Sequence, residues 1–386
     1  MNFSQRTSWN LAENDLTRAI HSARESGRDL IDLTISNPTA CGFDQPADLL
    51  AHLGDSAAAL YTPDPFGMPS ARAAVATYYS DLGSTIPLDN IALTTSTSEA
   101  YSYLFRLLCN PGEEVLAAQP SYPLFDFIAR LDDITLREYP LHYDPNADDH
   151  HSWSIDLDAL AASITPRTRA IILVHPNNPT GNYASASERA ALQQLCRDHN
   201  LALIVDEVFL DYALTTPQPT FATNSSCLTF TLSGLSKVCA LPQMKCSWIV
   251  TTGPDTLVHE ALARLEVIAD TFLSMNAPIQ HALPIWLGQR DNIQQQIIAR
   301  MRENLATLDA RLERTSAHRL SMQGGWTTIL RVPRTVDGVP FATAALARDV
   351  IVQPGDFYGL PEGRAVLSLL TPPDLWQRGL ARLPID

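Results

Sequence analysis

The sequence lacks the long apolar runs that a membrane protein needs. None of its 386 residues belongs to a stretch approaching the ~20 consecutive apolar residues that cross a bilayer, and its polar N-terminus lacks the apolar core of a secretion signal. Positive charge is also scarce, because 27 Lys and Arg stand against 42 Asp and Glu, a net charge of −15. Such a chain repels phosphates and anionic lipids, so we expect a soluble cytoplasmic protein without a nucleic-acid or membrane partner.

Paired cysteines and clustered metal ligands are missing as well. The six cysteines lie far apart, with no CxxC pair and no His at zinc-ligand spacing, which is typical of reduced structural thiols. One loop, 144–153, contains the adjacent residues Asp148, Asp149, His150 and His151. Adjacent side chains on a solvated loop rarely converge on one ion, so we expect no metal site.

What the chain does contain is enough apolar material for a large core. Hydrophobic residues make up 45% of the sequence and charged residues 18%, which excludes a disordered or fibrous protein. Short, uniformly apolar runs at 171–174, 202–205 and 246–250 predict buried parallel strands. Because parallel strands need helical connections that cover both faces of the sheet, we expect a three-layer α/β/α domain.

The helices expected around this sheet carry apolar stripes. One is predicted over 185–200, with Ser185 or Ser187 as its cap, and another over 97–109. Toward the C-terminus, a polar-rich helical pattern at 289–314 precedes apolar runs at 326–332 and 365–370. This last part of the chain predicts a second, smaller α+β domain.

Four segments carry residues suited to chemistry. Asp206 ends a buried strand, where a carboxylate needs a cationic partner, and Lys237 lies among small and apolar residues that keep its amine reactive. Asn178 follows another strand, and the hydroxyl-rich segment 95–100 begins a helix whose N-terminus attracts phosphate. Taken singly, a turn explains Asn178 and a helix cap explains Ser98. Together, an amine, a carboxylate, an amide and a helix N-terminus match the needs of pyridoxal 5'-phosphate.

The order of these segments resembles a known family. TSTSEA (95–100), HPNNPTGN (175–182), VDEVF (205–209) and SGLSK (233–237), with PSYPLF and PQMK, are similar to motifs of the class I and II aminotransferases, which are pyridoxal phosphate enzymes of fold type I. The resemblance runs from ISNP (35–38) to LSLLTPP (367–373). It implies a homodimer with sites at the subunit interface.

The resemblance also implies a division of the chain and a role for each motif residue. The large cofactor domain would span 46–285, and the small domain would combine 1–45 with 286–386. Lys237 would form the Schiff base and move the proton, and Asp206 would pair with the ring nitrogen. The other implied contacts are Asn178 to the ring 3-oxygen, Tyr122 stacked on the ring, and a phosphate cradle of Ser96, Thr97, Lys245 and, from the second subunit, Tyr61.

The chain departs from the family at four positions. Ser96 and Lys245 stand where the family usually has Gly and Arg, and Phe209 replaces a Tyr that often donates to the 3-oxygen, a place that Tyr183 or Tyr212 could fill. Val366 replaces the arginine that normally binds the substrate carboxylate. Two alternatives remain open for that carboxylate.

The first alternative is Arg364. If its segment is a strand, Arg364 lies on the same face as Val366 and its longer side chain could reach the pocket; otherwise it is a solvated residue. The second alternative is that donors near Ser36 and Asn37 hold the substrate, or that the substrate has no α-carboxylate.

The function expected from these residues is transfer of an amino group between an amino acid and a 2-oxo acid. Two other classes remain. The missing arginine favours another reaction on the same cofactor, such as β-elimination by a C–S lyase or decarboxylation. A non-catalytic pyridoxal phosphate-binding protein fits less well, because the lysine, aspartate and asparagine are all present.

Overall fold

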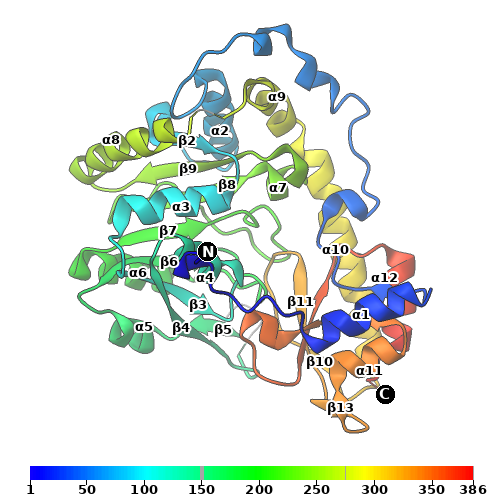
Figure 1. The fold of residues 1–386 in the computed structure, drawn as a ribbon. Coiled ribbons are helices and arrows are strands. Elements are labelled where there is room, and N and C mark those ends of the chain that lie inside the picture. The colour runs from blue at the N-terminus through cyan, green and yellow to red at the C-terminus, as the bar shows by residue number, and fades with distance from the viewer. Residues whose placement is uncertain (148–151, 274, 386) are drawn as a thin grey trace.

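A computed structural model describes residues 1–147, 152–273 and 275–385. Its centre is an eight-stranded sheet with the strand order β2-β9-β8-β7-β6-β3-β4-β5 (Figure 1). In that order, the strands are β2 (Ile91–Thr94), β9 (Ser247–Thr252), β8 (Thr229–Gly234), β7 (Ala202–Asp206), β6 (Thr168–Val174), β3 (Glu114–Gln119), β4 (Thr135–Tyr143) and β5 (Trp153–Ile155).

Helices cover both faces of this sheet, because neighbouring strand residues alternate between two apolar cores. Ile172 and Ile204 pack on one side with α3 (Thr97–Leu108), α4 (Leu124–Leu131) and α8 (Asp255–Thr271). Ile171 and Leu203 pack on the other side with α5 (Leu157–Ser163) and α6 (Ala186–His199). On that second side, α2 (Pro69–Asp81) and α9 (Ala277–Gly288) cover the end of the sheet at β2 and β9. The expected three-layer α/β/α arrangement is confirmed.

One expected strand direction is wrong. Segment 246–250 forms most of β9, but β9 runs antiparallel to both of its neighbours, β2 and β8. The uniformly apolar sequence of this segment indicates burial on both faces of the sheet, but it does not indicate whether the strand is parallel or antiparallel to its neighbours. The connection from β8 contains the four-residue helix α7 (Leu235–Val238) and the short 3-10 helix Pro242–Met244, which return the chain without a full helical crossover. The sheet is therefore mainly parallel.

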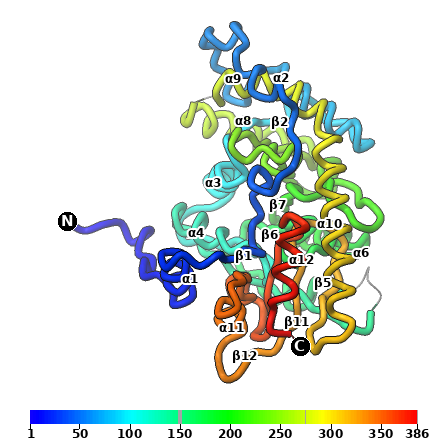
Figure 2. The backbone as a smooth tube through the Cα atoms, turned by 90° about the vertical axis from the view of Figure 1, so that its right-hand side faces the viewer, coloured from blue at the N-terminus to red at the C-terminus, as the bar shows by residue number. Residues whose placement is uncertain are grey.

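The smaller α+β part is built from both ends of the chain, as Figure 2 shows. Its four-stranded sheet has the order β10-β11-β16-β15, namely His318–Arg319, Thr327–Arg331, Arg364–Ser368 and Gln353–Pro354. Two short ribbons pair β1 (Ile31–Asp32) with β14 (Val350–Ile351) and β12 (Thr335–Val336) with β13 (Val339–Pro340). The helices are α1 (Asp15–Glu25), α10 (Arg290–Leu312), α11 (Phe341–Ala347) and α12 (Pro373–Arg382). The division at 46–285 stays a prediction.

Two further expectations concern absences. Asp148, Asp149, His150 and His151 lie outside the described residues, and in the remainder no group of three or more candidate ligands could hold a metal. No helix in the described part of the chain has the length and apolar character to cross a membrane.

A buried asparagine joins the long helix α10 to the segment after β16. Asn304 is fully buried, and its Nδ2 donates to the carbonyls of Leu369 at 2.9 Å and Thr371 at 2.8 Å. The Trp376 indole in turn donates to the Asn304 carbonyl at 2.9 Å. These bonds connect residues that lie 65 and more positions apart in the sequence.

We expect Asn304→Ala to lower the free energy of unfolding by about 2–4 kcal/mol, because two buried carbonyls lose their donor. Equilibrium denaturation in urea measures this difference. Asn292→Ala is the matched control on the same helix: Asn292 is exposed, so its replacement should cost within ~0.5 kcal/mol. Equal costs for the two variants would contradict the assigned role of Asn304.

Candidate functional site

The parallel strands of the large sheet end at one edge, where a cavity of about 290 Å³ opens. Residues following β2, β6, β7 and β8 all contribute to its wall, since parallel strands bring their carboxyl ends together. Its lining consists of Ser36, Thr97, Ser98, Tyr122, Phe125, Val174, Asn178, Asp206, Val208, Phe209, Ser236, Lys237, Trp326, Thr327 and Tyr358.

Asp206 is the carboxylate of this cavity and ends β7. Its exposed fraction is 7%, and it accepts hydrogen bonds from the Val208 amide to Oδ1 at 3.1 Å and from the Tyr101 hydroxyl to Oδ2 at 3.2 Å. Burial raises the pKa of Asp206 to about 6, against the opposing effects of these two donors and of Lys237. Among the described residues, two groups therefore donate hydrogen bonds to Asp206, and one cation attracts its carboxylate from a distance.

Lys237 is that cation. It follows β8 in the short helix α7, and its backbone carbonyl accepts the Tyr212 hydroxyl at 2.6 Å. Its Nζ lies 5.4 Å from the centre of the Trp326 ring and 5.7 Å from that of Phe209. Burial lowers the pKa of Lys237, and the attraction of Asp206 works in the opposite direction. A depressed pKa makes the neutral amine, the form that attacks carbonyl carbons, easier to reach.

The first turn of α3 forms another part of the wall. Ser96 caps the helix through its Oγ, which accepts the Glu99 amide at 3.1 Å, so the cap is Ser96 and the expectation for Ser98 is wrong. Ser98 and Thr97 instead line the cavity. A helix N-terminus presents unpaired amides and a positive dipole end, which suits a phosphate group.

The remaining polar and aromatic residues expected from the sequence are divided between the cavity and the surface. Tyr122, Asn178 and Ser36 line the cavity, and Asn178 Oδ1 accepts the Thr327 hydroxyl at 3.4 Å. Asn37 does not: its side chain caps the following turn through Thr39.

Two other expected residues lie on the surface. Lys245 is exposed and does not line the cavity, and Tyr61 is 74% exposed on the outer segment between 44 and 66. Tyr183 and Tyr212, the alternative donors to a ring oxygen, give their hydroxyls to the carbonyls of Leu210 and Lys237 and do not line the cavity.

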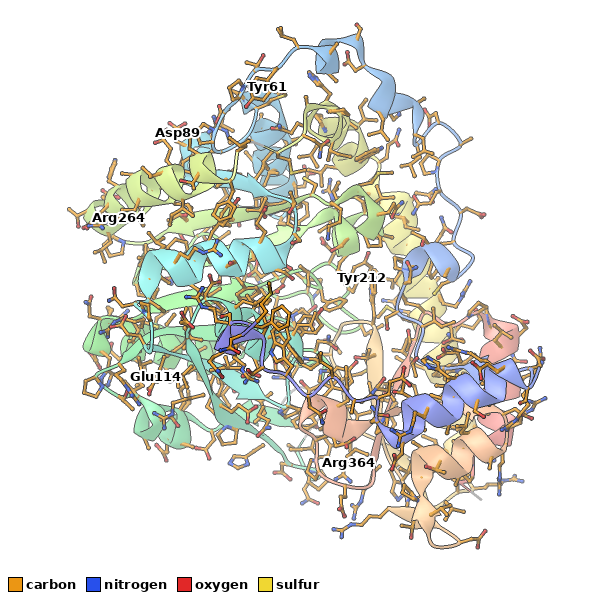
Figure 3. All side chains as sticks on the ribbon, viewed as in Figure 1. Tyr61, Asp89, Glu114, Tyr212, Arg264 and Arg364 are labelled. Carbon is orange, nitrogen blue, oxygen red and sulfur yellow. The ribbon has the colours of Figure 1, made fainter. Side chains whose placement is uncertain are left out.

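Arg364 does not reach the cavity. Its segment is a strand, as expected, but Val366 two residues on lies in the apolar core between the two sheets, and Ser368 donates to the Ile35 carbonyl at 2.6 Å. Arg364 thus sits at the far end of β16, with Arg331 as its cross-strand partner. Figure 3 shows Tyr61 and Arg364 near opposite ends of the molecule, with Tyr212 between them. Arg364 and Val366 are two residues apart on one strand and so share a face, but the cavity lies at the opposite end of that strand, where Thr327 pairs with Ser368.

Several residues of the site were missed by sequence reasoning. Tyr101, which does not line the cavity but donates to Asp206, could have been found, because it lies four residues after Thr97 and therefore on the same face of a helix. Trp326, Thr327 and Tyr358 carried no such signal, since they lie about ninety or more positions after Lys237 and only the fold brings them to it. Trp326 lies directly before β11, lines the cavity and is 1% exposed.

The donor set allows a test of whether pyridoxal phosphate fits. A buried carboxylate with no described cation in direct contact, a lysine whose pKa burial lowers and a helix N-terminus surround one space. The cofactor brings a ring nitrogen that can carry a proton, an aldehyde and a phosphate, one matching group for each. The residues present fit the cofactor.

Comparisons with known proteins agree with this geometry. A family model described as aminotransferase class I and II matches residues 10–378. The glutamate-pyruvate aminotransferase AlaA of Escherichia coli K12 is 31% identical over 273 residues, covering 70% of this chain and 66% of its own length. An alanine aminotransferase of Mycobacterium tuberculosis is 31% identical over 288 residues, covering 72% and 65%. The matched part of this chain thus covers just under two thirds of the length of each of these relatives.

Solved structures show the same fold. An alanine aminotransferase from Pyrococcus furiosus superposes with a TM-score of 0.87 at 22% identity, covering 99% of this chain and 98% of its own. An aspartate aminotransferase of Thermus thermophilus, in a single-mutant form, gives a TM-score of 0.84 at 22% identity, with 99% and 98% covered. Both support the fold type I architecture.

The charge coupling in the cavity gives a test that needs no ligand. In the protein without cofactor, Asp206→Asn should lower the pKa of Lys237 further, because it removes the attraction that stabilises the ammonium form. The pH dependence of Lys237 acetylation, followed by mass spectrometry, measures this pKa. Lys237 and Lys245 are the only lysines in the sequence, so assignment is direct.

Asp211→Asn is the control for that experiment, because Asp211 is also a buried carboxylate but does not influence the pKa of Lys237. The control should leave the acetylation profile in place. A shift of the same size in both variants would mean that Asp206 has no specific coupling to the amine.

Proposed function

Because this chain belongs to the class I and II aminotransferase family, whose members depend on pyridoxal phosphate, we propose that it transfers an amino group between an amino acid and a 2-oxo acid. The observation that carries the proposal is the pairing of Lys237 and Asp206 across one cavity. The 31% identity to named alanine and glutamate-pyruvate aminotransferases adds support.

Each residue has a task when the cofactor is bound. The cofactor supplies an aldehyde that links to amines and a ring that withdraws electrons from the neighbouring carbon. The carboxylate of Asp206 would keep the ring nitrogen protonated, and the first turn of α3 with Thr97 and Ser98 would bind the phosphate. Asn178 would donate to the ring 3-oxygen, and Tyr122 would pack on the ring face.

Lys237 would hold and move the proton when the cofactor is bound. Burial lowers the pKa of Lys237, which makes the neutral amine easier to reach, so Nζ would serve as the base that accepts the α-proton of the substrate. The rings of Trp326 and Phe209 near Nζ would exclude water and limit exchange of that proton with solvent.

The proposal includes assembly and location. Leu60 and Tyr61 are 69% and 74% exposed on the outer segment, which suits burial against a second copy of the chain. We expect a homodimer in which Ser96, Lys245 and the second subunit's copy of the outer segment complete the phosphate site. A cytoplasmic location accords with six cysteines that are all free.

Borohydride reduction of the yellow holoenzyme should fix the cofactor on Lys237, and the peptide map has only Lys237 and Lys245 to distinguish. Lys237→Ala should lose amino transfer by more than ~1,000-fold, because it removes both the attachment point and the proton carrier. Lys245→Ala, the matched control, should keep measurable turnover with weaker cofactor binding.

An amino-acid panel, assayed for oxo acid, ammonia and carbon dioxide, identifies the reaction. Oxo acid formed together with the aminated cofactor supports amino transfer. Ammonia or carbon dioxide as the main product would replace the proposal by elimination or decarboxylation. A label on Lys245 would refute the assignment of the amine.

A further inference from the structure

The carboxylate of Asp206 accepts a hydrogen bond from helix α3, whose first turn also lines the cavity. Tyr101 projects from the second turn of α3, and its hydroxyl donates to Asp206 Oδ2 at 3.2 Å. Thr97, one helical turn earlier, lines the cavity at the expected phosphate position. Helix α3 therefore carries both Thr97, which would bind the phosphate, and Tyr101, which holds the carboxylate that would meet the ring nitrogen.

The surroundings of Tyr101 favour this bond. The side chain is 2% exposed, so water does not compete for the hydroxyl. Its ring packs edge-on against Phe125 with 5.0 Å between centroids and lies 5.9 Å from Phe105, which fixes its orientation. Burial and the nearby Asp206 raise the pKa of Tyr101 well above its usual value, so the hydroxyl keeps the proton it donates.

The orientation of the Asp206 carboxylate in turn depends on two described hydrogen-bond donors. The Val208 amide holds Oδ1 at 3.1 Å, and Tyr101 is the side chain that holds Oδ2. Without the second bond, the carboxylate could rotate about its χ2 torsion, which is broad for aspartate. Two donors on two different oxygens set the plane of the carboxylate and leave its remaining lone pairs free for the cavity.

We propose that Tyr101 is a positioning residue of the cofactor site, whose hydroxyl fixes the carboxylate of Asp206 in the orientation that meets the ring nitrogen. This inference rests on the proposed function for the identity of the cofactor. It does not depend on which amino acid is the substrate or on the fate of the substrate.

The test compares Tyr101→Phe with Tyr139→Phe in the full-length protein. Both variants remove one hydroxyl from a fully buried tyrosine, but the Tyr139 hydroxyl donates to the Ile172 carbonyl at 2.9 Å and does not bond to Asp206. Tyr101→Phe should weaken pyridoxal phosphate binding by ~10-fold or more, in the range for hydrogen bonds to charged groups, whereas Tyr139→Phe should leave it within ~2-fold. In steady-state kinetics, kcat should fall with KM little changed.

A double-mutant cycle shows whether Tyr101 acts through Asp206. In an Asp206→Ala background, Tyr101→Phe should have no further effect on cofactor affinity. A loss that persists in this background, or equal affinities for the Tyr101 and Tyr139 variants, would overturn the proposal. If Tyr101→Phe unfolds at the assay temperature, Tyr101→Met fills similar space without a hydroxyl and repeats the comparison.

The binding experiments also separate this inference from the proposed function. Coupling between Tyr101 and Asp206 in cofactor affinity, with no amino transfer to any oxo acid, would refute the function and leave the positioning role intact. Amino transfer without coupling between Tyr101 and Asp206 would refute the positioning role and leave the proposed function intact.

Discussion

The rest of the site depends on one buried carboxylate, Asp206, beside which the described part of the chain places no cation in direct contact. Asp206 is 7% exposed, and burial raises its pKa to about 6 even though Val208 and Tyr101 donate to it. Burial therefore disfavours the ionised form of Asp206, and a positive charge inside the cavity would favour it. Lys237 supplies attraction from a distance, and a protonated ring nitrogen would supply it directly. Cofactor binding and the charge state of the site are therefore linked through one residue.

The fold provides the conditions that this carboxylate needs. The parallel strands β6, β7 and β8 deliver Asn178, Asp206 and Lys237 to one edge, and helix α3 adds its N-terminus there. The smaller α+β part contributes Trp326, directly before β11, whose ring centre lies 5.4 Å from Lys237 Nζ. Burial of this edge raises the pKa of the acid and lowers that of the amine, so the same exclusion of water prepares both groups for chemistry.

Sequence alone could predict the parts of the site that local pattern controls. The apolar runs before Asn178 and Asp206, and the helix that begins at Thr97, were recoverable because burial and helical periodicity leave a mark on neighbouring residues. The direction of β9 was not recoverable, since burial on both faces looks the same in either direction. Trp326 and the true distance of Arg364 from the cavity depend on how two distant sheets pack, and no local pattern records that packing.

The central claim is that Asp206 binds the cofactor through the ring nitrogen. The most direct measurement compares the dissociation constants of pyridoxal phosphate and of its carbon analogue, in which CH replaces that nitrogen, for the wild type and for Asp206→Ala. The account predicts that the wild type prefers pyridoxal phosphate by ~10-fold or more, as expected for a charge-assisted hydrogen bond, and that Asp206→Ala abolishes the preference. Equal affinity of the wild type for both compounds would contradict the account.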